Sequence, residues 1–167
     1  AAGSVKDQVP FVAGVFVPRA DPDFEKLSVM NQVLGGLFSS RINMNLREQH
    51  GYTYGAFSNI PENSEAGPFT VSAQVRTDVT AASAREVMKE LDGIVKAPMS
   101  AAELKAAKES IALTLPARFQ STLGTVATIG DLHLFDLPPD YYQRLPARLD
   151  AITVEQVYEA VQKHVKP

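Results

Sequence analysis

The feature that most restricts the fold of this chain is the uneven distribution of its strand and helix signals. Residues 9–77 carry most of the strand signals, whereas residues 78–167 are almost entirely helical in pattern and rich in alanine. The 167 residues contain no internal repeat, low-complexity tract or linker, which indicates one domain over residues 1–167. Three strands are too few for a stable lone sheet, so a further strand is expected from a misread segment or from chain outside this sequence.

The strand signals differ in their burial pattern. Residues 9–17 are almost continuously apolar, which predicts a strand buried on both faces or nearly so and ended by Pro18. Residues 54–60 and 69–76 have the pattern of an antiparallel pair joined by the loop at 61–68. Apolar and polar residues alternate in the second of these strands, so one of its faces is expected to be buried and the other to face water.

The predicted helices have well-marked ends. Asp21 and Pro22 begin the first helix as its cap and its first helical residue, and Gly51 ends the second. Two capping boxes, Ser100 to Glu103 and Thr153 to Gln156, open later helices. After the first helix, the predicted helices cover residues 40–50, 79–95, 100–116, 118–135, 141–149 and 153–165.

The composition excludes several classes of protein. The chain has no cysteine, which excludes disulfides, thiolate zinc sites, iron–sulfur clusters and a cysteine nucleophile. A formal net charge of −3 gives no electrostatic footprint for nucleic acid or an anionic membrane. No apolar run approaches the ~20 residues of a membrane span. The sequence also lacks glycine-rich phosphate loops and the Gly-x-Ser-x-Gly nucleophile motif.

The histidines of the chain, His50, His133 and His164, are isolated from one another in sequence. A zinc site needs three or four convergent ligands, and no local segment supplies two of them. Each histidine therefore has a structural interpretation. His164 lies in the last turn of a helix, where positive charge is favourable, His133 is expected to pack between helices, and His50 precedes a helix-ending glycine. The sequence predicts no metal site and no catalytic centre in this chain.

The segment at 35–55 is unusually dense in glycine, arginine and tyrosine. Arg47 precedes Tyr54 by seven residues, and Gly51 interrupts the helix between them, so a helix end and a strand start can bring the two side chains together. A guanidinium fork and a phenol that meet there can hold a carbonyl or carboxylate oxygen. The alternative is a surface ion pair between Arg47 and Glu48 or an aspartate, beside a half-buried tyrosine.

At this segment the sequence resembles the insulinase-like zinc peptidases, which include pitrilysin, the mitochondrial processing peptidase and small bacterial relatives. The resemblance runs through essentially the whole chain as several separate motifs at compatible spacing. These motifs are Gly35-Gly36-x-x-Ser39-Ser40-Arg41, Leu46-Arg47-Glu48-Gln49-x-Gly51-x-x-Tyr54, Val75-Arg76-Thr77-Asp78, Ser100-x-x-Glu103-Leu104, Leu137-Pro138-x-Asp140-Tyr141 and Arg148-x-x-Ala151-Ile152-Thr153.

The resemblance implies a fold class and a place in a larger enzyme. The implied fold is α+β, a mixed and largely antiparallel sheet with helices packed on one face, whose last strand is missing here. The family builds its enzymes from two similar halves, and the catalytic half carries His-x-x-Glu-His and binds zinc. This chain lacks that motif, so it resembles the non-catalytic C-terminal half. Zinc is expected only in the partner half, either fused upstream or a separate subunit.

By the same resemblance, Arg47 and Tyr54 match the pair with which the family grips the peptide backbone beside the scissile bond. The implied function is the substrate-binding half of a zinc-dependent endopeptidase with a peptide substrate. The alternative is a non-enzymatic scaffold subunit of the same fold, as in the core proteins of a respiratory complex. The compartment stays open, although small bacterial relatives are often exported.

Overall fold

The computed structural model describes the backbone of residues 6–166 and the side chains of residues 16–166. Three strands, β1 (Lys6–Phe16), β2 (Thr53–Asn59) and β3 (Gly67–Arg76), form a sheet in the order β1-β3-β2. Both pairings in this sheet are antiparallel. The predicted α+β class and the predicted β2–β3 pair are thus confirmed, and the missing last strand stays a prediction.

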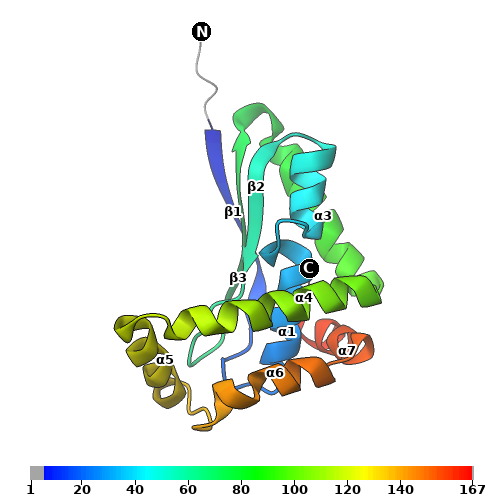
Figure 1. Cartoon of the computed structure of the whole chain (residues 1–167). Helices are drawn as coiled ribbons and strands as arrows, with labels where there is room; N and C mark the ends of the chain where they lie inside the picture. Colours follow the sequence, from blue (N-terminus) through cyan, green and yellow to red (C-terminus); the bar gives the residue numbers. More distant parts are fainter. Residues whose placement is uncertain (1–5, 167) are drawn as a thin grey trace.

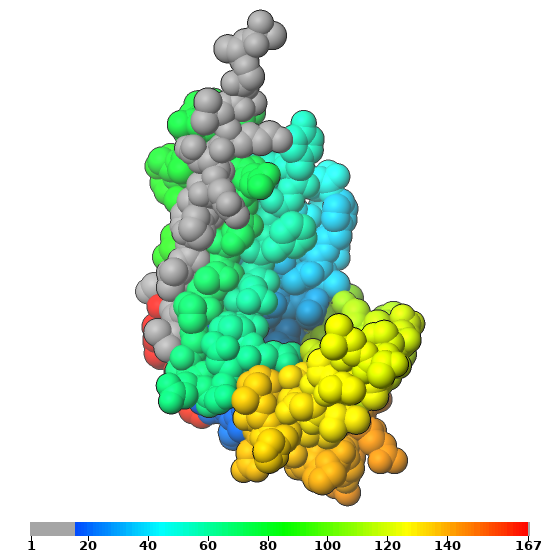
Figure 2. All heavy atoms as spheres, turned by 90° about the vertical axis from the view of Figure 1, so that its left-hand side faces the viewer, coloured from blue at the N-terminus to red at the C-terminus, as the bar shows by residue number. Residues whose placement is uncertain are grey.

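Helices cover one face of this sheet. Figure 1 shows α1 and α3 on one side of the strands, with α4 crossing α1 and with α6 and α7 in the lower part of the molecule. The other face of β2 and β3 is open in Figure 2. The helical elements are α1 (Phe24–Asn31), η1 (Gln32–Gly36), α2 (Arg41–Asn43), η2 (Met44–Gln49), η3 (Thr77–Val79), α3 (Thr80–Lys96), α4 (Ala101–Thr114), η4 (Leu115–Phe119), α5 (Thr122–Leu134), α6 (Tyr141–Ala151) and α7 (Val154–His164).

The alternation of buried and exposed residues along β3 shows which face of the sheet lies against the core. Phe69, Val71, Ala73 and Val75 are buried toward the helices, whereas Gln74 and the other alternate residues point away from them, as the sequence predicts. The core is completed by apolar side chains of the two covering helices, Leu27, Met30, Val87, Leu91 and Ile94. The prediction that β1 is buried on both faces concerns side chains before Phe16, which lie outside the described residues.

Most predicted helix ends are confirmed, and two are shifted. Both capping boxes form, with Ser100 and Thr153 as the caps. The helix predicted from residue 118 begins at Thr122, because Ser121 caps it and the preceding turn is a 3-10 helix. The helix predicted from Pro22 begins at Phe24. Its entry is an Asx turn, in which the Asp21 carboxylate accepts a 2.8 Å hydrogen bond from the Asp23 N–H.

Among the described residues, no helix combines the length and the apolar character needed to cross a membrane.

Candidate functional site

The turn between Arg47 and Tyr54 is built as the sequence predicts. Arg47 lies in η2, a π-helical turn that continues α2, and Gly51 follows it with a φ of 61°. This left-handed conformation favours glycine, because any other residue carries a Cβ that would be strained there. The Gly51 N–H donates to the Arg47 carbonyl at 3.0 Å, and the Tyr52 N–H donates to the Leu46 carbonyl at 2.8 Å. The chain thereby reverses directly into β2.

This reversal places Arg47 and Tyr54 on one hollow of about 450 Å³. Tyr54 is 85% exposed and also borders a neighbouring hollow of about 400 Å³ on the open face of the sheet. Gln74 and Arg76 of β3 line the first hollow as well. Sequence reasoning missed these two residues as site residues. The alternation of β3 was the signal that could have found them, because it places both on the face that points away from the helices.

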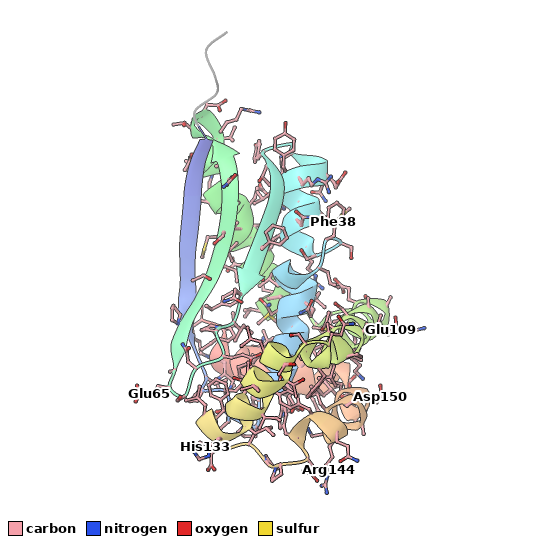
Figure 3. All side chains as sticks on the ribbon, turned by 60° about the vertical axis from the view of Figure 1, so that its left-hand side comes forward. Phe38, Glu65, Glu109, His133, Arg144 and Asp150 are labelled. Carbon is pink, nitrogen blue, oxygen red and sulfur yellow. The ribbon has the colours of Figure 1, made fainter. Side chains whose placement is uncertain are left out.

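The surroundings of Arg47 distinguish it from an ordinary surface arginine. Its guanidinium carbon lies 4.2 Å from the centroid of the Phe38 ring, a cation–π contact. Phe38 is an exposed residue beside the α2–η2 helix (Figure 3). The predicted alternative pair also exists, since Arg47 Nη1 lies 3.5 Å from Glu48 Oε1. Among the described residues, however, this buried Nη1 has no hydrogen-bond partner.

Arg47 Nη1 has only this longer ion-pair contact with Glu48 and is screened from solvent, so a ligand in the hollow would meet the exposed part of the Arg47 side chain. Arg76, in the same hollow, differs because its Nε donates to the Asp78 carboxylate at 3.1 Å. This bond lowers the pKa of Asp78 and keeps the carboxylate charged. The two arginines therefore differ in how firmly they are held: Arg76 is hydrogen-bonded to an acid, whereas Arg47 has a longer ion-pair contact with Glu48 at 3.5 Å.

Asn43 ties the helix that carries Arg47 to the strand that carries Tyr54. Its buried side chain accepts a 3.1 Å hydrogen bond from the Ala56 N–H and donates to the Phe38 carbonyl. The register of β2 relative to β3 shifts between Thr53 and Ala56. At that irregularity the Asn43 side chain accepts the hydrogen bond from the Ala56 N–H. The relative position of Arg47 and Tyr54 is thus held by a buried amide that sequence reasoning did not single out.

Two of the sequence motifs meet through an ion pair. Arg41 donates through Nε and Nη2 to the two carboxylate oxygens of Glu103, at 2.7 and 3.0 Å. The same carboxylate closes the capping box with Ser100. These hydrogen bonds, with that from Arg41 the largest, lower the pKa of Glu103 to about 2. The pair fastens the start of α4 to the start of the helix that bears Arg47.

Replacing Glu103 by glutamine is expected to reduce stability at neutral pH but much less in acid. The folded pKa of Glu103 is about 2 against an ordinary value of 4.5, so its stabilisation is present above 4.5 and is lost as the pH falls toward 2. Urea unfolding of both proteins at several pH values measures this. The difference in unfolding free energy should shrink with acidification, and Glu109→Gln, on an exposed residue, should show no such trend. A difference that stays constant with pH would contradict the assignment.

The histidines contact acids and rings rather than one another. His164 Nε2 lies 3.0 Å from Asp23 Oδ2, and His50 stacks on Tyr52 with ring centroids 4.9 Å apart. The interpretation of His133 as an interhelical packing residue is wrong. Its side chain is exposed at the outer edge of α5 (Figure 3), because the helix face that bears it contacts no other described helix closely enough to bury it.

One cluster in the described part of the chain brings three metal-ligating atoms together. Atoms of Asp21, Asp23 and His164 lie within 4.8 Å of one another. The Asp23 oxygens, however, already accept hydrogen bonds from Lys26 at 2.7 Å and Lys163 at 2.8 Å. These bonds lower the pKa of Asp23, with Lys163 the largest cause. A carboxylate neutralised by two ammonium groups does not fit zinc, so the cluster joins α1 to α7 instead.

The sequence model of the peptidase M16 inactive domain matches residues 6–111. A crystal structure of the peptidase M16 inactive domain from Pseudomonas fluorescens is 28% identical, with a TM-score of 0.82, and the match covers 95% of this chain and 37% of that one. This chain therefore spans well under half the length of that relative. No curated protein matches the sequence significantly.

Two more distant structures share the fold alone. The inactive peptidase domain of a Bordetella parapertussis protein, described provisionally as a zinc protease, is 14% identical with a TM-score of 0.79, over 97% of this chain and 88% of that one. A chain of complex III2 from Candida albicans is 15% identical with a TM-score of 0.79, over 95% of this chain and 40% of that one. The match to the sequence model covers well over half of the 167 residues. This chain belongs to the peptidase M16 inactive-domain family.

Proposed function

We propose that this chain is the substrate-binding, non-catalytic half of a zinc-dependent endopeptidase. In this proposal Arg47 and Tyr54 hold the peptide backbone next to the scissile bond, and a partner half supplies the zinc and the general base. The observation that carries the proposal is that Tyr54 and Arg47, whose side chain stays partly exposed, line the same hollow.

The chemistry assigned to the pair is positioning and polarisation. A guanidinium N–H and a phenol O–H both donate to a peptide carbonyl oxygen, and such bonds strengthen as negative charge develops on that oxygen. Phe38 supports the guanidinium from one side, and Asn43 holds the two elements in register. Bound zinc would supply an activated water from the catalytic half, whereas this chain would contribute orientation and charge stabilisation.

Replacing Tyr54 by phenylalanine tests the proposal with the loss of one oxygen atom. In the assembled peptidase we expect a fall in kcat/KM for peptide hydrolysis of about tenfold, because a donor to the carbonyl is removed while the ring stays. The matched control is Tyr158→Phe, on a half-buried tyrosine of α7 that does not line the hollow. Equal turnover by both variants would refute a role of the Tyr54 hydroxyl.

The alternative is a scaffold subunit without chemistry, and the similarity in fold to a complex III2 chain is the observation in its favour. An assembled protein that contains no zinc and cleaves no peptide would establish the scaffold and refute the peptidase. Zinc together with turnover that depends on Tyr54 would do the reverse.

A further inference from the structure

Helix α5 exposes an apolar face that the domain leaves uncovered. Leu123, Val126, Ile129 and Leu134 are each at least 58% exposed. Among the residues of α5 only Thr128 is buried, and it faces the rest of the domain. Several large exposed apolar side chains on one helix are unusual on a domain that works alone, and they indicate an interaction site.

The spacing along this face fits a second helix. Leu123, Ala127, Gly130 and Leu134 follow one another at intervals of four, three and four residues, and all four are exposed. This is the spacing of the seam along which one helix packs against another. Asp131 is the only acidic residue of α5, which contains no lysine or arginine, and its carboxylate faces Arg118 at 3.6 Å. The seam itself therefore carries no charge.

Gly130 is compatible with such a seam, because packing inside its own domain does not require a glycine there. A Cβ built on Gly130 meets no atom within 4 Å, whereas one built on Gly124 would lie 2.6 Å from the Arg118 carbonyl oxygen. Gly124 is thus explained by packing inside the domain. Gly130 weakens the helix without such a benefit, and it lies at the centre of the exposed seam between the two leucines. A neighbouring backbone that approaches α5 closely would explain it.

The position of α5 indicates which partner this is. Figure 1 shows α5 at the far end of α4, beyond the sheet on the side away from α1 and α3. That is the side on which Tyr54 and Phe57 are exposed on the open face of β2. The Pseudomonas fluorescens relative is covered to only 37% by this chain, so a protein of that kind has ample further chain to occupy the face.

We infer that a helix of the catalytic half packs on the seam formed by Leu123, Val126, Ala127, Gly130 and Leu134. This inference rests on the proposed function, since it takes the partner to be the half that supplies the zinc. The partner helix presents an apolar stripe to α5 and holds the catalytic half across the open face of the sheet, where Arg47 and Tyr54 lie.

Thiol labelling of the assembled protein tests the inference. These 167 residues contain no cysteine, so Val126→Cys introduces the only thiol among them, and Asp150→Cys places a matched thiol on an exposed position of α6 (Figure 3), with labelling followed at each introduced position. The expected result is labelling by a maleimide at least about tenfold slower at position 126 than at position 150. Comparable rates in an intact assembly would overturn the inference. Oxidative joining of two copies of this chain through the thiols introduced by Val126→Cys would also overturn it, because the occupant would then be a second copy.

A pair of glycine variants gives a second readout on the assembled protein. Gly93 of α3 also has no atom within 4 Å of a built Cβ, so Gly93→Ala is expected to leave the Tm unchanged or raise it. Gly130→Ala is expected to lower the Tm by about 2 °C or more, because its methyl group intrudes on the partner. A rise in Tm with both variants would overturn the inference.

The docking inference and the proposed function can fail separately. If the labelling or the Tm results contradict the docking of a partner helix while peptide turnover still depends on Tyr54, the proposed function stands. Protection at position 126 without such turnover would refute the function and not the docking face.

Discussion

Replacing Arg47 by alanine is expected to lower peptide turnover by the assembled peptidase at least about tenfold, with the zinc content unchanged. The Arg47 side chain is partly exposed and lines the same hollow as Tyr54. Loss of a single preorganised donor to a developing oxyanion reduces turnover by about 10²–10³-fold in well-ordered sites. We expect the lower end of the effect, because Arg47 is partly exposed and Tyr54 remains as a second donor.

Two controls separate this role from a general effect of charge. Arg47→Lys keeps the positive charge but loses the planar fork and much of the contact with Phe38, so it should recover only part of the turnover. Arg144→Ala removes an exposed arginine at the opposite end of the molecule from Phe38 (Figure 3) and should leave turnover unchanged. An undiminished rate for Arg47→Ala would remove Arg47 from the proposed mechanism, and loss of zinc in that variant would indicate damage to the assembly instead.

Replacing Gly35 by alanine is expected to destabilise the domain by about 1–3 kcal/mol, the usual cost of overpacking a tight contact. A Cβ on Gly35 would lie 2.6 Å from the backbone nitrogen of Ser58 and would also overlap its side chain. The Ser58 hydroxyl cannot easily turn away, because it donates a 2.6 Å hydrogen bond to the Asn31 side chain. The η1 turn and β2 must therefore separate, which strains the strand that carries Tyr54.

The neighbouring glycine provides a matched control. A Cβ on Gly36 would meet chiefly the end of the Gln32 side chain, at 2.8 Å from its Oε1, and this flexible group can rotate away. Urea unfolding of both variants should show the larger loss of stability for Gly35→Ala. Equal losses would contradict close approach to β2 as the cause at Gly35, since helix propensity alone would favour alanine at both positions.

Local signals were sufficient to predict much of the fold from the sequence. The capping boxes at Ser100 and Thr153 and the stop at Gly51 depend on residues a few positions apart, so they are visible in the sequence and all are present in the structure. The face of β3 that enters the core also follows from simple alternation. In the site, the residue pattern left a surface ion pair of Arg47 as an alternative, and the resemblance to the insulinase-like peptidases singled out Arg47 and Tyr54. The structure brings both residues to one hollow, and their role stays a prediction.

The features that the sequence did not reveal depend on pairs of residues from different elements. Nothing near Arg41 in the sequence indicates Glu103 as its partner. The support of Arg47 by Phe38 also depends on how one loop folds over a helix. The exposure of Leu123, Val126, Ile129 and Leu134 on α5 also depends on tertiary packing, because the sequence of a helix does not show which of its faces its own domain covers.

The strand order has a consequence for the synthesis of the protein. In the described sheet β1 pairs only with β3, and its register joins Lys6 to Arg76 and Phe16 to Gly67. After β1 emerges from the ribosome, its pairing partner β3 is complete only when about sixty further residues have been made. This takes roughly 3–12 seconds at ordinary rates of translation. During that interval a nearly continuous apolar segment has no ladder partner, whereas β2 can pair with β3 as soon as β3 emerges, because only a short loop separates them. The nascent chain is thus most exposed to aggregation, and most in need of a chaperone, before β3 leaves the ribosome.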